Sequence, residues 1–127
     1  MRVALMLKQY PNVREALSDR FHYILIDEYQ DTNHAQYTIA SCLAQSHRNL
    51  CATGDPDQSI YAWRGADMKN ILEFESDYSD ALVVRLEQNF RSTGAILSAA
   101  SELIAYNDFR KAKRLWTDGE RGANVRV

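Results

Sequence analysis

The chain has 127 residues, of which 46% are hydrophobic and 25% are charged, and its formal net charge is -2. These values are typical of a single globular domain with enough apolar material for a core. The net charge excludes the global basic field that marks many nucleic-acid-binding proteins, so any contact with a polyanion must come from local arginine and lysine side chains.

Cysteine usage and apolar runs bear on the cellular compartment. Cys42 and Cys51 lie in apolar surroundings without a CxxC spacing, which predicts buried free thiols in a reducing cytosol. No apolar run approaches the roughly 18 residues of a membrane span, and the first residues show no signal-peptide pattern. We therefore expect a cytoplasmic protein with no membrane partner.

Helices and strands are expected to alternate along the chain. The first twenty residues favour helix, interrupted at Pro11, where Asn12 and Glu15 have the spacing of a capping box. An apolar run rich in β-branched and aromatic residues predicts a strand at 21–26. The elements expected after it are a helix at 33–46, a strand at 50–53, a helix capped by Asp67, a strand at 81–86, a long helix capped by Ser92 and a candidate strand at 125–127.

Strands that alternate with helices predict an α/β layer fold with a mainly parallel sheet. Ligands of such sheets bind at the carboxyl ends of the strands. Here the three strand ends carry DEYQD (27–31), GDPDQ (54–58) and QNFR (88–91). We expect them to meet along one edge of the sheet, and this convergence predicts a binding site better than any one motif does.

The first strand end carries two adjacent acids, Asp27 and Glu28. A nucleotide-bound Mg²⁺ needs only one or two protein carboxylates, and a neighbouring acid can orient or deprotonate the attacking water in phosphoryl transfer. In the alternative interpretation, Asp27 and Glu28 are simply polar residues that end a strand, and Asp31 or Asn33 caps the next helix.

The second strand end is the loop GDPDQSIYAWRGA (54–66). Gln58 is able to hydrogen-bond a phosphate oxygen or a water. Tyr61 and Trp63 offer flat faces on which nucleic-acid bases stack, and Arg64 is suited to a backbone phosphate. In the alternative interpretation the two aromatics belong to the core and Arg64 is a surface ion-pair partner.

The third strand end carries Phe90 and Arg91. Arg91 is suited to meet a γ-phosphate as an arginine finger, and Phe90 is suited to stack on a purine. Alternatively, this segment is an ordinary helix entry in which Ser92 caps the helix and Arg91 lies in solvent.

Together these motifs resemble the superfamily 1 DNA helicases of the UvrD/Rep/PcrA type. DEYQDTN (27–33) is similar to the Walker B motif of that family, GDPDQSIYAWRGA to its third motif and LEQNFRS (86–92) to its fourth. The resemblance continues through ILSAASELI (96–104) and KRLWT (113–117), so it covers nearly the whole chain.

The resemblance implies an ATP-driven motor with two RecA-like domains, which binds ATP and Mg²⁺ between them and moves 3′-to-5′ on single-stranded DNA to unwind duplex. On the matching positions, Asp27 and Glu28 would hold Mg²⁺ and Glu28 would activate the hydrolytic water. Gln58 would sense the γ-phosphate and couple it to DNA, and Arg91 would reach the γ-phosphate. Phe90 stands where the family often has a tyrosine that stacks on adenine, and it lacks the hydroxyl.

The resemblance also implies contacts with DNA and a domain boundary. Tyr61, Trp63 and Arg64 would contact the single strand. Residues 1–91 would be the C-terminal part of the first RecA-like domain, and residues 92–127 would begin the second. We therefore expect an incomplete RecA-like fold.

A phosphate-binding loop needs GxxxxGK[ST], and none of the five glycines in this sequence is followed by lysine. The resemblance is therefore to the middle of a motor, and we expect no ATP hydrolysis by this chain alone. One hypothesis is a fragment of an ATP-dependent DNA helicase, with repair or replication proteins as partners. The other is a free-standing, non-catalytic remnant that binds DNA or a partner protein.

The joint presence of the acids, the glutamine and the arginine favours the fragment, because a remnant freed of catalysis need not keep them together. The sequence is also compatible with a segment of a helicase–nuclease subunit that contains the same motor. The pathway that the protein serves, repair or replication, is also open.

Overall fold

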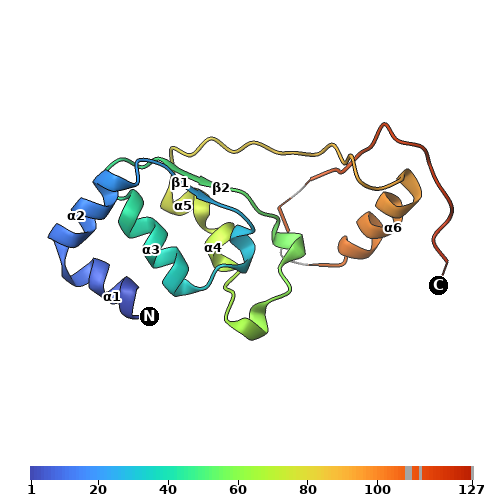
Figure 1. Ribbon diagram of the computed structural model, residues 1–127. Helices are drawn as coiled ribbons and strands as arrows, with labels where there is room; N and C mark the ends of the chain where they lie inside the picture. Colours follow the sequence, from blue (N-terminus) through green and yellow to red (C-terminus); the bar gives the residue numbers. More distant parts are fainter. Residues whose placement is uncertain (108–109, 112, 127) are drawn as a thin grey trace. The chain divides into compact units, whose positions relative to one another are not determined.

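The chain forms two units, Met1–Ser79 and Asp80–Val127, in a computed structural model that describes residues 1–107, 110–111 and 113–126 (Figure 1). The elements of the first unit are α1 (Arg2–Gln9), α2 (Pro11–Arg20), β1 (Ile24–Ile26), η1 (Tyr29–Asp31), α3 (His34–Ala44), β2 (Leu50–Ala52), η2 (Pro56–Gln58), η3 (Ala62–Arg64), α4 (Lys69–Leu72) and α5 (Phe74–Asp77), where η marks a 3-10 turn. The second unit contains α6 (Gly94–Ile104).

The two strands pair in parallel, as the alternation of strands and helices predicts. Leu25 of β1 is in register with Cys51 of β2, and the pairing continues past the strands, where the Thr53 amide donates to the Ile26 carbonyl at 2.8 Å. Parallel neighbours bring both carboxyl ends to the same edge. An α/β arrangement is thus confirmed, with a two-stranded sheet in the part of the chain that the structure describes.

The helices α1 and α2 pack against α3. Leu7 of α1 and Ala44 of α3 are each only 1% exposed. At the end of α2, the buried Ser18 hydroxyl donates to the Leu43 carbonyl at 2.7 Å and lies 2.6 Å from the Ser46 hydroxyl. A polar group buried with such partners fixes the helix register without leaving an unsatisfied hydrogen bond.

The helix starts agree with the sequence at one position and differ at another. Asn33 caps α3, because its side-chain oxygen accepts from the amides of Ala35 and Gln36, and the Gln36 side chain accepts from the Asn33 amide. The expected cap at Asn12 is wrong. Pro11 occupies the first turn of α2, whose N-cap is Tyr10 without a side-chain cap, so Asn12 is already inside the helix.

Two later helix starts are displaced by one position. The Asp67 carboxylate accepts from the Lys69 amide at 3.1 Å, although the formal N-cap of α4 is Met68. In the second unit Thr93, rather than the expected Ser92, is the N-cap of α6. Differences of one residue at a helix end are ordinary, because helix ends fray and a terminal turn often has 3-10 geometry.

The strand expected at 81–86 is not formed. These residues carry no strand pairing, and Leu82 and Leu86 are 90% and 84% exposed. The nearest ladder contact is an isolated bridge between Gln88 and Trp116. An apolar run becomes a strand only beside another strand that accepts and donates its backbone hydrogen bonds, and the described residues of the second unit supply that partner at Gln88 alone.

The expected strand at 125–127 is also absent from residues 125 and 126, while residue 127 lies outside the described part of the chain. The two cysteines are free, but neither is buried as expected, because Cys42 is half-buried and Cys51 is exposed. It shares a face of the sheet with Leu25, which is 76% exposed, so this face is open to solvent. None of the helices in the described part of the chain has the length and apolarity that crossing a bilayer requires.

Candidate functional site

Asp27 marks the carboxyl end of β1, next to the end of β2. Its Oδ1 atom accepts the Thr53 hydroxyl at 2.7 Å and the Glu28 amide at 3.0 Å. These two hydrogen bonds hold the pKa of the Asp27 carboxyl below its usual value, and the bond from Thr53 has the larger effect. Both bonds fall on one oxygen of an exposed side chain, so an ionised carboxylate is presented to solvent at this edge.

Glu28 follows in an unusual backbone conformation. Its φ is 50° and its ψ is 47°, the left-handed region that non-glycine residues rarely adopt. Such a residue costs on the order of 1–3 kcal/mol and persists where its surroundings fix it. The side chain is held as well, because its Oε2 atom accepts from Gln30 Nε2 at 2.7 Å. Asp27 and Glu28 together form the acidic pair.

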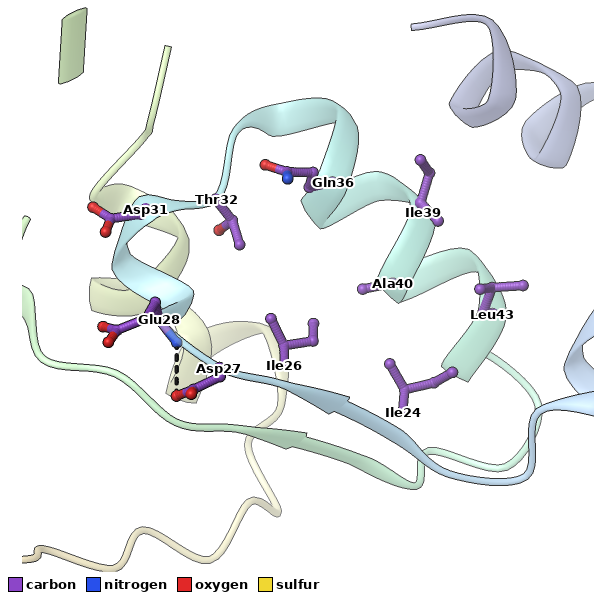
Figure 2. A pocket seen from close by; sticks show the side chains of 10 residues that line it. All are labelled: Ile24, Ile26, Asp27, Glu28, Asp31, Thr32, Gln36, Ile39, Ala40 and Leu43. Atoms are coloured by element: carbon purple, nitrogen blue, oxygen red, sulfur yellow. Dashed lines mark hydrogen bonds between the residues drawn. The ribbon is translucent and has the colours of Figure 1, made fainter. Parts of the chain in front are cut away.

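A cavity of about 450 Å³ adjoins the acidic pair (Figure 2). Asp27, Glu28 and Asp31 lie at one end of it, with their carboxylates directed away from the apolar side chains in this view. Thr32, Gln36 and apolar side chains of β1 and α3 line the rest. The α3 residues Ile39 and Leu43 are only half-buried there. The apolar face of α3 therefore contributes to an open hollow beside the acids.

Gln30 joins the two strand ends. Its side chain is 1% exposed, and while Nε2 donates to Glu28, Oε1 accepts from the Asp55 backbone amide at 3.0 Å. The adjacent Gly54 leaves the room for this contact, because a Cβ at that position would lie 2.6 Å from Gln30 Oε1. Gln30 is a site residue that the sequence reasoning missed.

Asp55 continues the same set of hydrogen bonds into η2. Its Oδ1 atom accepts from the Asp57 amide at 3.0 Å, and its Oδ2 atom accepts from Gln58 Nε2 at 2.8 Å. The exposed Gln58 side chain is therefore held against the first turn of η2. Four residues, Glu28, Gln30, Asp55 and Gln58, are thus joined in series, with Asp55 contributing its backbone amide to Gln30 and its carboxylate to Gln58.

Tyr61, the N-cap of η3, forms the aromatic cluster together with Trp63 and Arg64 of η3. The Arg64 guanidinium carbon lies 5.1 Å from the centre of the Tyr61 ring and 4.6 Å from that of Trp63. The ring centres are 6.3 Å apart, with planes inclined by 52°. Trp63 is 74% exposed and Tyr61 36%, so the alternative that these rings belong to the core is wrong.

The loop that carries the aromatic cluster, residues 54–67, is fastened at both ends to the segment after β1. Its start is held by Gln30, and near its end the Asp67 amide donates to the Thr32 carbonyl at 2.9 Å. The buried Asn70 side chain donates to the same carbonyl and to the Thr32 hydroxyl. Gly65, with a φ of 86°, makes the left-handed turn that ends η3.

Phe90 and Arg91 belong to the second unit. The Asn89 side chain accepts from the Arg91 amide at 2.9 Å and from the Ser92 amide at 2.7 Å, which fixes the turn before α6. Phe90 is 86% exposed and Arg91 is exposed. The structure thus brings two of the three expected strand ends together in the first unit, and the roles of Phe90 and Arg91 stay predictions.

Residues 1–79 match the UvrD/REP helicase N-terminal domain. The chain belongs to the UvrD/REP helicase family. It is 52% identical over 120 residues to the ATP-dependent DNA helicase PcrA of Staphylococcus aureus (strain Mu50 / ATCC 700699), and that match covers 94% of this chain. The identity and coverage are the same for the ATP-dependent DNA helicase PcrA of Staphylococcus epidermidis (strain ATCC 12228 / FDA PCI 1200). The chain spans 16% of the length of these relatives.

The acidic pair of this UvrD/REP-family chain fits a nucleotide-bound Mg²⁺ better than a metal held by protein alone. Within the described residues, no group of three or more His, Cys, Asp or Glu side chains converges to hold a metal ion. A Mg²⁺ that arrives with phosphates keeps several waters and takes one or two carboxylates. The exposed, ionised Asp27 beside Glu28 has that donor set.

Gln30 went unnoticed because the sequence signal at this position is weak. In the segment Glu28–Asp31, Gln30 is one of several polar residues that follow a strand, and its residue type alone does not distinguish it. The one available signal was Gly54, since a glycine directly after a second strand indicates a close approach by a neighbouring group. The sequence does not identify that neighbour, whereas the parallel pairing of β1 and β2 does.

Proposed function

We propose that this chain is a segment of an ATP-dependent 3′-5′ DNA helicase that couples ATP hydrolysis to movement on single-stranded DNA and to duplex unwinding. The observation that carries the proposal is the connection between two chemically different groups. The acidic pair at the strand ends is linked, through Gln30, to the loop that presents the exposed aromatic cluster. The names of the relatives, ATP-dependent DNA helicases, point to the same function.

On the nucleotide side, Asp27 and Glu28 hold the Mg²⁺ of ATP, which supplies charge stabilisation for phosphoryl transfer when bound. Glu28 orients the attacking water and accepts its proton, and the hydrogen bond from Gln30 Nε2 holds that carboxylate in one direction. Gln58 donates to the γ-phosphate from η2. Arg91 and Phe90 complete the nucleotide contacts in this proposal, with Arg91 at the γ-phosphate and Phe90 on the adenine ring.

On the DNA side, the aromatic cluster binds a single strand. Stacking of a base on an exposed aromatic ring is worth about 1–3 kcal/mol and depends little on sequence, which suits a motor that must move along any sequence. Arg64 lies over both rings, so it is pre-positioned to meet a backbone phosphate beside a stacked base. Because the formal net charge is -2, this local arrangement must supply the affinity.

The proposal assigns the chain to a RecA-like motor. Residues 1–91 are the C-terminal part of the first RecA-like domain and residues 92–127 the beginning of the second. The parallel β1–β2 pair with its flanking helices is compatible with that assignment. The unpaired apolar residues 81–86 are consistent with it as well, because they have the composition of a strand whose neighbour belongs to another part of the motor.

Without GxxxxGK[ST], whose amides and lysine cradle the phosphates, the 127 residues alone do not hydrolyse ATP in this proposal. The activity is therefore tested in a chimera, in which the matched 120 residues of the S. aureus PcrA are replaced by those of this chain. We expect the chimera to hydrolyse ATP in response to single-stranded DNA, and Glu28→Gln to lower the turnover by about 10²–10⁴-fold.

Glu15→Gln, at an exposed acid of α2, is the matched control and leaves the turnover unchanged. A chimera that folds and binds DNA but does not hydrolyse ATP would support the alternative of a non-catalytic remnant. Hydrolysis that survives Glu28→Gln would contradict the assignment of Glu28.

A further inference from the structure

The series of hydrogen bonds from Glu28 to Gln58 crosses from one strand end to the other through a single buried amide. Glu28 Oε2 accepts from Gln30 Nε2, Gln30 Oε1 accepts from the Asp55 amide, and Asp55 Oδ2 accepts from Gln58 Nε2, at 2.7, 3.0 and 2.8 Å. Glu28 and Gln58 are themselves exposed, whereas Gln30 is 1% exposed. The buried link therefore joins two groups that face solvent.

We propose that Gln30 is a positioning residue that couples the orientation of Glu28 to that of Gln58 through Asp55. This relay comprises Glu28, Gln30, Asp55 and Gln58. The proposal rests on the proposed function for what the two ends meet, a water and a γ-phosphate. The coupling itself is a property of this chain.

The chemistry of the amide permits one orientation. The backbone N–H of Asp55 can only donate, so the Gln30 atom that faces it is the oxygen, and the NH₂ group then faces the Glu28 carboxylate. A flipped amide would place its donor against an N–H group and its oxygen against a carboxylate. Because the side chain is buried, water is not available to satisfy the flipped state, which makes that state costly. The hydrogen bond to the Asp55 amide thus fixes the side of the Gln30 amide that meets Glu28, and the hydrogen bond to Glu28 fixes the side that meets Asp55.

The surroundings hold the amide in place. Gly54 is packed so closely that a Cβ there would lie 2.6 Å from Gln30 Oε1 and 3.0 Å from the Tyr29 amide nitrogen. The backbone of Gln30 is held as well, because the hydroxyl of Ser59, the C-cap of η2, donates to the Gln30 backbone carbonyl at 3.4 Å. Gln30 Nε2 also donates, at 3.5 Å, to Asp31 Oδ2. A change in the direction of the Glu28 carboxylate is therefore passed by the Gln30 amide to the Asp55 amide and, with it, to Gln58, while Asp31 stays as the second acceptor of the NH₂ group.

The relay is tested by NMR on the isotopically labelled 127-residue chain, without nucleotide or DNA. In the wild type we expect a scalar coupling across the hydrogen bond between the Asp55 amide nitrogen and the Gln30 side-chain carbonyl carbon. Glu28→Ala should shift the signals of the Asp55 amide and of the Gln58 side-chain NH₂. In a Gln30→Met background, which keeps the length of the side chain without its polar atoms, Glu28→Ala should leave both signals unmoved.

The conservative variant Gln30→Glu tests for rescue of the relay. Because its carboxyl is buried beside the carboxylates of Glu28 and Asp31, it takes up a proton, accepts from the Asp55 amide and still donates to Glu28. The Asp55 amide should therefore stay protected and its response to Glu28→Ala should persist, whereas both are lost in Gln30→Met. In Gln30→Met the Asp55 amide should exchange with solvent about tenfold faster, the factor that corresponds to losing one hydrogen bond. Asn49→Ala, which removes a side-chain bond to the His22 carbonyl elsewhere, is the control and leaves the coupling intact.

The proposal is overturned if the wild type shows no coupling between Asp55 and Gln30. It is also overturned if Glu28→Ala shifts the Asp55 signal equally in the wild type and in Gln30→Met. If Gln30→Met does not fold, the wild-type coupling and Gln30→Glu decide the matter. An inactive chimera would count against the proposed function but not against the relay, because this test uses neither ATP nor DNA.

Discussion

Asp27 and Thr53 come from different strands, and the hydrogen bond between them shows how the end of β2 prepares the end of β1. The Thr53 hydroxyl donates to Asp27 Oδ1 at 2.7 Å and is the first cause of the lowered pKa of that carboxyl. The sequence alone predicts a role for the acid but not for the threonine 26 residues away. The threonine faces the acid only because the two strands are parallel neighbours.

Removing the hydroxyl at position 53 should raise the pKa of Asp27. In Thr53→Val the shape of the side chain is kept and the donor is lost, so the pKa returns toward its usual value; in Thr53→Ser the donor is kept and the pKa stays low. A ¹³C NMR titration of the Asp27 carboxyl carbon measures both variants. Equal pKa values in the two variants would mean that the threonine does not stabilise the carboxylate.

Gly54→Ala should destabilise the first unit. The added methyl group would lie 2.6 Å from Gln30 Oε1 and 3.0 Å from the backbone nitrogen of Tyr29, so side chain and backbone would both have to shift. We expect a loss of about 1–3 kcal/mol in the free energy of unfolding, measured with chemical denaturant. Gly94→Ala in α6 is the control, because a Cβ there makes only ordinary contacts, the nearest at 3.6 Å. A Gly54→Ala protein as stable as the wild type would show that the approach of Gln30 is not tight.

At the scale of elements, local signals predicted the helices better than the strands. The break at Pro11 and the cap at Asn33 are confirmed, because each depends on backbone groups within four residues of itself. The prediction of a strand at 81–86 was wrong, because a strand forms only when a second strand is available to pair with its backbone. Even the strand expected at 21–26 is reduced to Ile24–Ile26, the three residues that face β2.

Asn33→Ala should weaken α3, since it removes an acceptor for two amides at the helix start. The expected loss is about 0.5–2 kcal/mol in the free energy of unfolding. Asn12→Ala is the matched control, because Asn12 lies exposed inside α2 and makes no cap, so stability should change by no more than about 0.5 kcal/mol. Equal losses in the two variants would contradict the capping box.

At the scale of the whole molecule, the resemblance identified the residues of the two strand ends, and the structure supplied their connections. The aromatic cluster was expected from residue types, and its exposure and its packing around Arg64 are findings of the structure. The role of Gln30 is not predictable from the sequence, because a buried amide becomes a link only when both of its partners are placed.

The tyrosines between η1, α3 and α5 should make the protein sensitive to alkali. Burial is the first cause that raises the pKa of both Tyr29 and Tyr37 above the ordinary value of 10.0. The folded state then keeps protons that the unfolded chain releases, so this stability is full below pH 10 and falls as the pH rises toward the folded-state pKa values.

Unfolding by denaturant at intervals from about pH 8 to about pH 11 should show that decline. Tyr29→Phe keeps the edge-to-face contact with Phe74 and should make the decline shallower. Tyr23→Phe, at a side chain that is 74% exposed, is the control and should leave the slope unchanged. A wild-type stability that does not fall in this range would contradict the account of the buried tyrosines.

The central claim is that the aromatic cluster on the 54–67 loop binds single-stranded DNA, and a titration of the labelled chain with oligothymidylate tests it most directly. We predict that the NMR signals of the Trp63 indole and the Tyr61 ring move on binding and that Trp63→Ala abolishes the response. The signal of Trp116, in the second unit, serves as the internal reference and stays in place. Binding that leaves Trp63 unmoved, or persists unchanged in Trp63→Ala, would contradict the claim.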